Sequence, residues 1–424
     1  MDMIEKKGGI MKGIWPDSYL DNPYPNKSLE EIWQDLDAYS FEEIYEQPSN
    51  HKSARFIVPI PPLYYKNRFV KGFCFTQVTR LLLDNIPEIK KLFFVCANSM
   101  CFSYPWAHDA DCFFTCYKYP ERERYFKNKY PHTKNIVCLP LQDADFTNEI
   151  TMKPVEPKLP KVIDLFCVST AFPVKNIPMI AKSLKVYEQK YNKRLHVVYA
   201  IGSNEAKKNK DGSLDYSGMT NYAQNELKKV DEILGNTKDY IDFIPYITYT
   251  DLPKYFSISK CGVLGSLIEG KNRFISEALS CDMPVIVFKQ FNQFSRGDSP
   301  IFLAQNSGEY APEFTPESLA DTIHKVLMNL ENYTPRQNYL EYRGRKNFVK
   351  TVANEISYYQ ENIPDLKGGD VFNNTWVNEA CLDNYGISYQ DFLYGKKPSW
   401  SNVVTLDTMF NLANAYLKKF DNIK

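Results

Sequence analysis

Short apolar runs alternate with amphipathic stretches along most of the chain, and this alternation restricts the fold more than any other feature of the sequence. It is clearest in the second half, where we predict strands at 162–168, 196–201, 241–244, 261–264 and 284–288. We predict helices at 177–191, 222–234, 251–256, 274–280 and 316–330, the third capped by Thr250. Strands that alternate with helices at this spacing indicate βαβ units and a parallel sheet.

The first half shows the same alternation with fewer elements. We predict parallel strands at 55–60, 92–97, 110–115 and 135–139, and helices at 75–83 and 121–128. Lys71 and Gly72 fall in the loop between the first strand and the first helix. The first half therefore predicts a second, smaller α/β domain.

A proline-rich connector separates the two halves. Three prolines lie within residues 154–160, a composition typical of a semi-rigid spacer between domains. The predicted fold class is α/β, with two Rossmann-like domains at 54–150 and 161–335. Residues 1–53 form an N-terminal extension in this interpretation, and residues 336–424 form a mainly helical C-terminal segment that packs back on the first domain.

The balance of charge limits the classes of partner. Lys plus Arg (51) equal Asp plus Glu (51), so no global field attracts the chain to nucleic acid. Local basic stretches at 207–210 and 343–346 are interpreted as solvated surface, with contact to phosphate or acidic lipid as the alternative. The N-terminus lacks a signal-peptide pattern, and no run reaches the roughly 18–20 apolar residues of a membrane span. We therefore expect a cytoplasmic protein, with peripheral contact to the inner face of the membrane left open.

Metal-binding and redox patterns are weak in this sequence. The ten cysteines lack a paired close spacing, and the five histidines lie far apart, so we expect reduced thiols and no metal centre. Asp-x-Asp pairs occur at Asp109 with Asp111 and at Asp143 with Asp145, both in the first domain.

One loop in the second half carries the clearest pattern for chemistry. Glu269 and Glu277 are separated by seven residues, the first at a strand end and the second within the following helix. Gly270 permits close backbone approach, and the N–H groups of residues 271–274 open the helix where its dipole attracts anions. Lys271 and Arg273 add cations to this diphosphate-sized site. Taken alone, Glu277 is also compatible with a helix-surface carboxylate and Glu269 with a helix cap.

This block resembles the signature of retaining GT-B glycosyltransferases of the group 1 (family 4) type. In that family two glutamates have this spacing, and the second is followed by Ala and then by a Pro-Val strand, here Ala278 and Pro284-Val285. The resemblance implies two Rossmann-like domains facing across a cleft, the first for the acceptor and the second for the nucleotide-sugar. It also implies a UDP- or GDP-linked donor, with no metal and no other cofactor.

Further positions agree with this resemblance. Lys175 takes the place of the family's phosphate-binding lysine, whereas Thr170 stands where an arginine is usual. Asp145 and Phe146 match the loop before the interdomain linker. The resemblance assigns donor binding to Glu277, Gly270, Lys271, Asn272, Arg273, Phe274, Gly202, Ser203, Thr170 and Pro245.

The resemblance also implies roles in transfer. Lys175 stabilises the leaving diphosphate, Glu269 orients the sugar, and His108 of the first domain lies near the sugar, although a solvated lysine and a structural histidine are the alternatives. The implied activity is transfer with retention to a glycan or lipid-linked acceptor, in cell-surface polysaccharide synthesis. A non-catalytic scaffold or nucleotide-binding protein of the same fold is the alternative, which Thr170 favours and the intact glutamate pair opposes.

Overall fold

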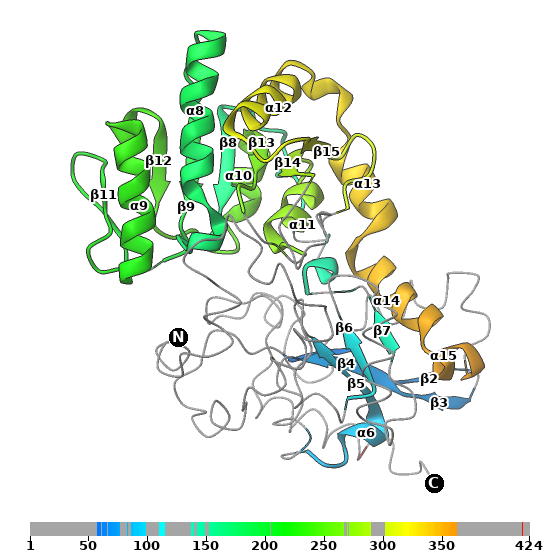
Figure 1. The fold of residues 1–424 in the computed structure, drawn as a ribbon. Helices are drawn as coiled ribbons and strands as arrows, with labels where there is room; N and C mark the ends of the chain where they lie inside the picture. Colours follow the sequence, from blue (N-terminus) through cyan, green and yellow to red (C-terminus); the bar gives the residue numbers. More distant parts are fainter. Residues whose placement is uncertain are drawn as a thin grey trace, which may run out of the picture. The chain divides into compact units, whose positions relative to one another are not determined.

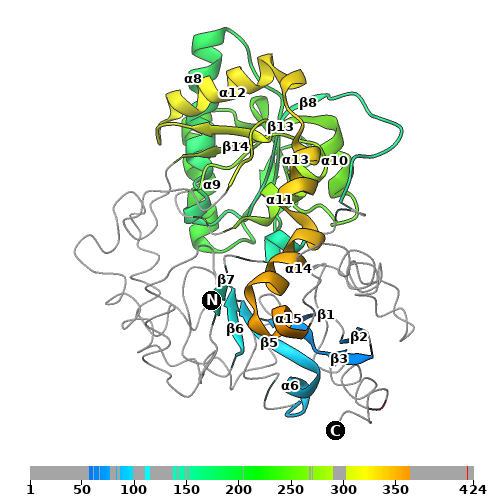
Figure 2. The same cartoon turned by 90° about the vertical axis from the view of Figure 1, so that its right-hand side faces the viewer.

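The computed structural model of the chain forms two compact units (Figures 1 and 2). It describes residues 152–362 except 204, 267–268, 270 and 290–301, residue 418, and segments 57–60, 62–65, 67–76, 83, 86–98, 110–114, 137–139, 141, 143–147 and 149. Residues 144–344 belong to the second unit. The described residues before 144 and after 344 belong to the first unit.

The second unit is built on a six-stranded sheet. In spatial order its strands are β12 (Ile241–Ile244), β9 (Val197–Ala200), β8 (Ile163–Val168), β13 (Ser259–Val263), β14 (Val285–Phe288) and β15 (Gly308–Ala311). Every neighbouring pair is parallel. The chain moves outward from β8 to β12, returns to β13, and then moves outward to β15. Strands β8 and β13 are therefore neighbours at the point where the strand order reverses, which is where ligands bind in doubly wound sheets.

Of the described helices of this unit, four connect successive strands from β8 to β14, and two follow β15. They are α8 (Ile177–Tyr191), α9 (Asn221–Leu234), α10 (Leu252–Ile258), α11 (Arg273–Ser280), α12 (Pro316–Met328) and α13 (Pro335–Tyr342). Helix α8 packs between α9 and α12, and α11 packs against α13 (Figure 1). A small antiparallel hairpin, β10 (Lys207–Lys208) and β11 (Leu214–Asp215), lies between β9 and α9.

The central strands are apolar because helices cover them. Strands β9 and β14 are buried along their whole length, and β8 is buried except at its last residue. Phe166 of β8 contacts the rings of Phe256 and Phe274 from α10 and α11, at 5.5 Å and 6.4 Å between centroids. Each such side chain contributes roughly 1.5–3 kcal/mol when it is fully buried. The core of the second unit therefore fixes the ends of β8 and β13, where the site is expected.

The first unit contains a five-stranded sheet in the order β1 (Ile57–Ile60), β4 (Gly72–Thr76), β5 (Phe93–Asn98), β6 (Cys112–Phe114) and β7 (Val137–Leu139). A two-stranded ribbon, β2 (Leu63–Tyr65) and β3 (Arg68–Val70), and a short helix, α6 (Ile89–Leu92), accompany it. Helices α14 (Gly344–Glu355) and α15 (Ser357–Asn362) supply aromatic side chains to this sheet. The hydroxyl of buried Tyr359 donates to the carbonyl oxygens of Lys71 and Gly72, both at 2.9 Å.

The predicted α/β class is confirmed in both units, but several details were wrong. The strand predicted at 55–60 is β1, which pairs antiparallel with β4, so it does not open the parallel part of the sheet. The helix predicted from Phe75 fails at its start, because Phe75 and Thr76 continue β4. The N-cap of helix α10 is Asp251, not Thr250, and the Asp251 side chain makes no capping hydrogen bond. Lys71 lies just before the amino end of β4. Ligands of such sheets bind at the opposite edge, beyond the carboxyl ends of the strands.

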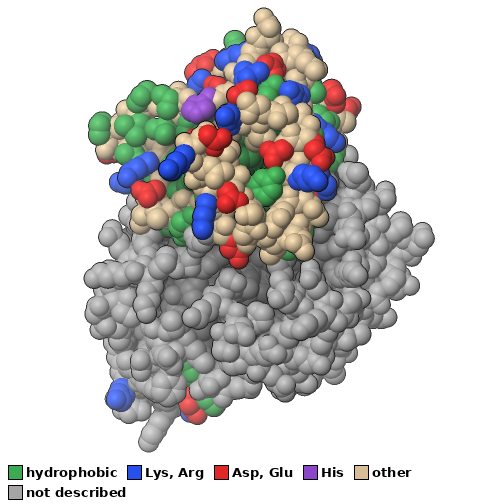
Figure 3. Space-filling view, turned by 90° about the vertical axis from the view of Figure 1, so that its left-hand side faces the viewer, with side chains coloured by type: hydrophobic (Ala, Val, Ile, Leu, Met, Phe, Trp, Pro, Cys, Tyr) green, Lys and Arg blue, Asp and Glu red, His purple; other side chains and the backbone are tan. Residues whose placement is uncertain are grey.

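The surface of the second unit carries both signs of charge. Figure 3 shows Lys and Arg interspersed with Asp and Glu over the described part of this face. Lys208 in the basic stretch at 207–210 is ion-paired with Asp242 of the edge strand. Among the described helices, none combines the length and the apolar character that crossing a bilayer requires.

The described cysteines behave as small core residues. Cys74, Cys96, Cys112, Cys167, Cys261 and Cys281 are buried and free of disulfides. Burial raises the pKa of the Cys167 thiol to about 12, so it stays protonated at neutral pH. The prediction of reduced, buried thiols is confirmed for these six residues.

Candidate functional site

Two loops at the carboxyl ends of β8 and β13 bring a lysine and a glutamate together. The Nζ atom of Lys175 lies 2.5 Å from Oε1 of Glu269. The lysine follows β8 and the glutamate follows β13, so the pair spans the two neighbouring strands at which the strand order reverses. Both residues were predicted from the sequence to act on the same ligand, and the fold places them at hydrogen-bonding distance.

The loop after β8 holds Lys175 through a tight turn. Residues Pro173–Lys175 form one 3-10 turn, and Asn176 then adopts a left-handed conformation (φ 49°) before α8 begins. The side chain of Asn176 donates to the carbonyl oxygen of Gly265 at 3.2 Å. A Cβ atom at Gly265 would lie only 3.1 Å from the carbonyl oxygen of Asn176, so glycine permits this close approach of the two loops. The lysine therefore starts from a fixed position beside β13.

Glu269 is held by a second hydrogen bond. Its side chain is 6% exposed, and its Oε1 atom accepts from the hydroxyl of Ser266 at 2.7 Å. Ser266 is completely buried and lies three residues after the end of β13. Ser266 was not among the residues predicted from the sequence, although a Ser-x-x-Glu spacing at a strand end is a signal that could have found it. A buried carboxylate is stable only when such donors compensate for its lost hydration.

Helix α11 carries the second glutamate. Glu277 is 8% exposed at its side chain and pairs with Arg273 one turn earlier, at 3.2 Å. The burial of Glu277 excludes the alternative of a solvated surface carboxylate. Asn272 caps the helix by accepting from the N–H of Phe274 at 2.9 Å, and the ring of Phe274 is in the core. The Phe274 N–H is therefore hydrogen-bonded to the Asn272 side chain, whereas we had expected it to face an anion.

The third predicted cation, Lys271, also has an acidic partner. Its Nζ atom lies 2.8 Å from Oδ2 of Asp145, and these side chains are 18% and 10% exposed. Asp145 lies in the 3-10 turn Asp143–Phe146, in the part of that turn that belongs to the second unit. The sequence placed this Asp-x-Asp pair in the first domain, away from the diphosphate site, and for Asp145 that was wrong: its carboxylate lies in the second unit, in an ion pair with Lys271.

The other predicted donor-binding residues lie on the same edge of the sheet. Gly202, with φ +66°, turns the chain after β9, and the N–H of Ser203 donates to the carbonyl oxygen of Pro245 at 2.8 Å. Pro245 directly follows β12, so this bond joins two strand ends. Thr170, in the loop after β8, is exposed.

A hydroxyl pair that sequence analysis missed lies beside Thr170. The Ser169 hydroxyl is 2.5 Å from the phenol oxygen of Tyr199. Burial raises the pKa of Tyr199 far above its ordinary value, so the phenol stays protonated. The nearby charge of Glu269 contributes to the same shift. This neutral pair adds hydrogen-bonding capacity to the strand-end loops without adding charge.

Two predicted site residues, Gly270 and His108, lie outside the described residues. The described residues contain no cluster of three or more His, Cys, Asp or Glu side chains placed to hold a metal ion.

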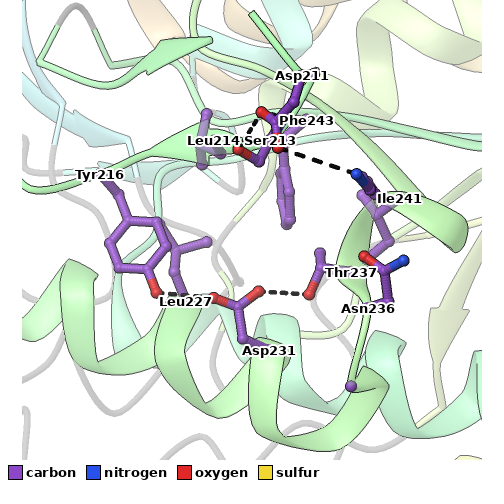
Figure 4. Close-up of a pocket in the computed structure, with 13 residues that line it drawn as sticks. Asp211, Ser213, Leu214, Tyr216, Leu227, Asp231, Asn236, Thr237, Ile241 and Phe243 are labelled. Carbon is purple, nitrogen blue, oxygen red and sulfur yellow. Dashed lines mark hydrogen bonds and ion pairs between the residues drawn. The ribbon is translucent and has the colours of Figure 1, made fainter. Parts of the chain in front are cut away.

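A pocket of about 220 Å³ lies elsewhere in the second unit (Figure 4). It is enclosed by the hairpin loop, the end of α9 and the edge strand β12, and none of the predicted site residues lines it. Its central carboxylate, Asp231, accepts hydrogen bonds from the hydroxyls of Tyr216 and Thr237. The pocket is therefore separate from the loops after β8 and β13.

Comparison with known families identifies part of the chain. Residues 149–347 match the family described as "Glycosyl transferases group 1". The matched segment contains both strand-end loops and both glutamates. The predicted resemblance to group 1 glycosyltransferases is thereby confirmed over these residues. No curated protein matched the chain.

Several solved structures are similar to the chain. Sucrose-phosphate synthase from Thermosynechococcus elongatus is 16% identical, with 70% of this chain and 72% of that chain covered and a TM-score of 0.40. TarM from S. aureus is 15% identical, with 62% and 51% covered and a TM-score of 0.43. HepE from Anabaena, solved in complex with UDP, is 13% identical, with 68% and 76% covered and a TM-score of 0.44. The chain spans about half the length of TarM.

The burial of Glu277 leads to a first prediction. If this carboxylate accepts hydrogen bonds from ribose hydroxyls, Glu277→Gln keeps its shape but weakens charge-assisted bonds. We expect roughly tenfold weaker binding of UDP or GDP, which corresponds to about 1.4 kcal/mol. Isothermal titration calorimetry with the nucleotide and with inorganic pyrophosphate checks this. Pyrophosphate, which lacks the ribose, should bind the variant at least as well as the wild type, since the substitution removes a negative charge beside Arg273; unchanged nucleotide binding would contradict the assignment.

Proposed function

We propose that this chain, which carries a group 1 glycosyltransferase domain at residues 149–347, transfers a sugar from a nucleoside-diphosphate sugar to a glycan or lipid-linked acceptor. One observation carries the proposal. Lys175 and Glu269 meet at 2.5 Å across the two strands where the order of a doubly wound parallel sheet reverses. An anionic leaving group and a sugar bind at such strand ends, where backbone N–H groups and helix N-termini face the ligand.

Charge stabilisation is the main chemical task of this site. When the bond between the sugar and the diphosphate breaks, negative charge develops on the diphosphate, and the Lys175 ammonium stabilises it. A preorganised donor of this kind is worth about 2.7–4 kcal/mol of transition-state energy. Glu269 orients the transferred sugar, and Glu277 orients the ribose. The leaving diphosphate assists deprotonation of the acceptor on the same face of the sugar, which retains the anomeric configuration.

The remaining features of the proposal concern donor, acceptor and location. The donor is UDP- or GDP-linked, and the reaction needs no metal because side-chain cations act on the diphosphate. The acceptor belongs to a cell-surface polysaccharide, so the enzyme works in the cytoplasm and contacts the inner face of the membrane peripherally.

A second candidate function has one observation in its favour. Thr170 occupies the position where the family usually has an arginine, so the site has one cation fewer than the family pattern implies. A protein that binds a nucleotide without turnover, or a non-catalytic scaffold, would tolerate this loss. Lys175 with its buried partner Glu269 favours the enzyme, because this pair lies at the carboxyl ends of β8 and β13, where the strand order reverses.

Slow donor hydrolysis tests the proposal without a known acceptor. The purified chain is incubated with UDP- and GDP-sugars, and the released nucleoside diphosphate is measured with and without EDTA. We expect hydrolysis of at least one donor at a rate that EDTA leaves unchanged, and NMR of the sugar should show the donor's anomeric configuration in the first product. Nucleotide binding without hydrolysis would support the binding protein, and neither binding nor hydrolysis would support the scaffold.

A further inference from the structure

The described cations of the loops after β8 and β13, and of the first turn of α11, are matched by acidic partners. Lys175 pairs with Glu269, Lys271 pairs with Asp145, and Arg273 pairs with Glu277, at 2.5, 2.8 and 3.2 Å. These six side chains sum to zero charge. A nucleoside diphosphate brings two or more negative charges to this place, and one of these cations can pair with it only by exchanging its present partner.

Two of the three pairs are poorly suited to exchange. Arg273 and Glu277 are one turn apart on the same helix, and the guanidinium also lies 5.8 Å from the ring centre of Tyr249. Lys271 joins its loop to Asp145 in the segment that precedes the proline-rich connector, with both side chains at most 18% exposed. Opening the Lys271 pair would detach its loop from the segment around Asp145, and the Arg273 guanidinium is also held beside the Tyr249 ring.

The pair between Lys175 and Glu269 has the features that exchange requires. The lysine is the more exposed partner, at 22% against 6%, and its long side chain can swing from the fixed turn before α8. The glutamate keeps the hydrogen bond from buried Ser266 when the lysine leaves. Loss of the lysine therefore does not leave this carboxylate without a donor, which limits the cost of opening the pair.

We propose that Glu269 holds the ammonium group of Lys175 until the donor binds, and then yields it to the diphosphate. This inference rests on the proposed function and adds a step to donor binding. The carboxylate stays on Ser266 and becomes an acceptor for the hydroxyl groups of the transferred sugar. The same movement places the ammonium group of Lys175 on the leaving diphosphate and frees the Glu269 carboxylate to accept hydrogen bonds from the sugar. The site can therefore stabilise the leaving group and orient the sugar only when a donor is present.

This exchange predicts an unusual sign for one substitution. Glu269→Gln removes the competing charge but can still accept from Ser266, so Lys175 is released to the ligand. We expect UDP or GDP to bind about tenfold more tightly to this variant. Donor hydrolysis should fall, because the sugar hydroxyls lose the charged carboxylate that accepts their hydrogen bonds. Uridine and guanosine, which lack the diphosphate, should bind as they do to the wild type. Calorimetry on the full chain measures all of these affinities.

A double-mutant cycle separates exchange from simple repulsion by the carboxylate. The gain from Glu269→Gln should be distinctly larger with Lys175 present than in a Lys175→Met background. Equal gains in the two backgrounds, or no gain with Lys175 present, would overturn the inference. Glu226→Gln is the matched control, because Glu226 is equally buried and pairs with Lys229 on α9, and it should leave nucleotide affinity unchanged.

The outcomes also distinguish this inference from the proposed function. If the wild type binds neither UDP nor GDP and hydrolyses no donor, the proposed function fails and the inference fails with it. If the wild type binds and hydrolyses a donor but Glu269→Gln weakens nucleotide binding, only the exchange is wrong.

Discussion

Replacement of Lys175 by methionine should lower kcat/KM for donor hydrolysis by about a hundredfold to a thousandfold. The reason is that the ammonium stabilises charge which develops only as the diphosphate leaves, and removal of one such donor costs about 2.7–4 kcal/mol. Methionine preserves most of the apolar stem and removes the charge. The rate of UDP or GDP release from each donor, measured over a range of donor concentrations, gives the ratio directly.

The fold offers a close control for this substitution. Lys260 of β13 bonds Asp164 of β8 at 2.6 Å, with side chains 29% and 11% exposed, so it is a similar ion pair between the same two strands at the opposite edge of the sheet. Burial tends to raise the pKa of Asp164, but hydrogen bonds from Lys260 and the His196 amide lower it below the ordinary value. Lys260→Met should therefore destabilise the unit while leaving kcat/KM unchanged. Equal losses of activity in the two variants would mean that Lys175 acts only through stability.

Alanine at Gly308 should destabilise the second unit by about 3 kcal/mol or more, which places it among the most damaging single substitutions. Gly308 opens β15 and pairs with Val285 of β14. A Cβ atom there would lie 2.0 Å from the carbonyl oxygen of Val285 and 2.8 Å from its nitrogen, and neither backbone atom can move without disrupting the sheet. Thermal unfolding followed by circular dichroism should show a melting temperature lower by about 6–12 °C.

Gly212 provides the comparison for this effect. It has φ +85° and no atom within 4 Å of a built Cβ, so alanine there meets only the intrinsic cost of a left-handed backbone, about 1–2 kcal/mol. Gly212→Ala should therefore destabilise clearly less than Gly308→Ala. A reversed order would mean that the pairing of β14 with β15 contributes little to the stability of the unit.

Much of the second unit could be predicted because its sequence pattern is strong. Residues 177–191 form α8 as predicted, since the apolar positions repeat at helical spacing and Asn192 ends the helix in a left-handed conformation. Strand β15 was missed, because only its last residue, Ala311, is buried and its pattern resembles a loop. In the first unit, Phe75 and Thr76 were assigned to a helix because a short apolar run does not distinguish a strand from a helix.

The candidate site was predictable only where a local spacing marks it. The separation of Glu269 and Glu277 and the strand-end position of Lys175 indicated these residues as ligands of a diphosphate sugar. The partners of the cations were not predictable, since Lys271 and Asp145 are 126 positions apart and meet only through the fold. Likewise, nothing in the sequence indicated that Lys175 and Glu269 bond to each other.

A crystal structure of the chain bound to UDP or GDP tests the central claim most directly. We expect the diphosphate to lie beyond the carboxyl ends of β8 and β13, with an oxygen within hydrogen-bonding distance of Nζ of Lys175 and the ribose beside Glu277. A nucleotide bound in the pocket around Asp231, or at the strand ends with Lys175 turned away from its phosphates, would contradict it.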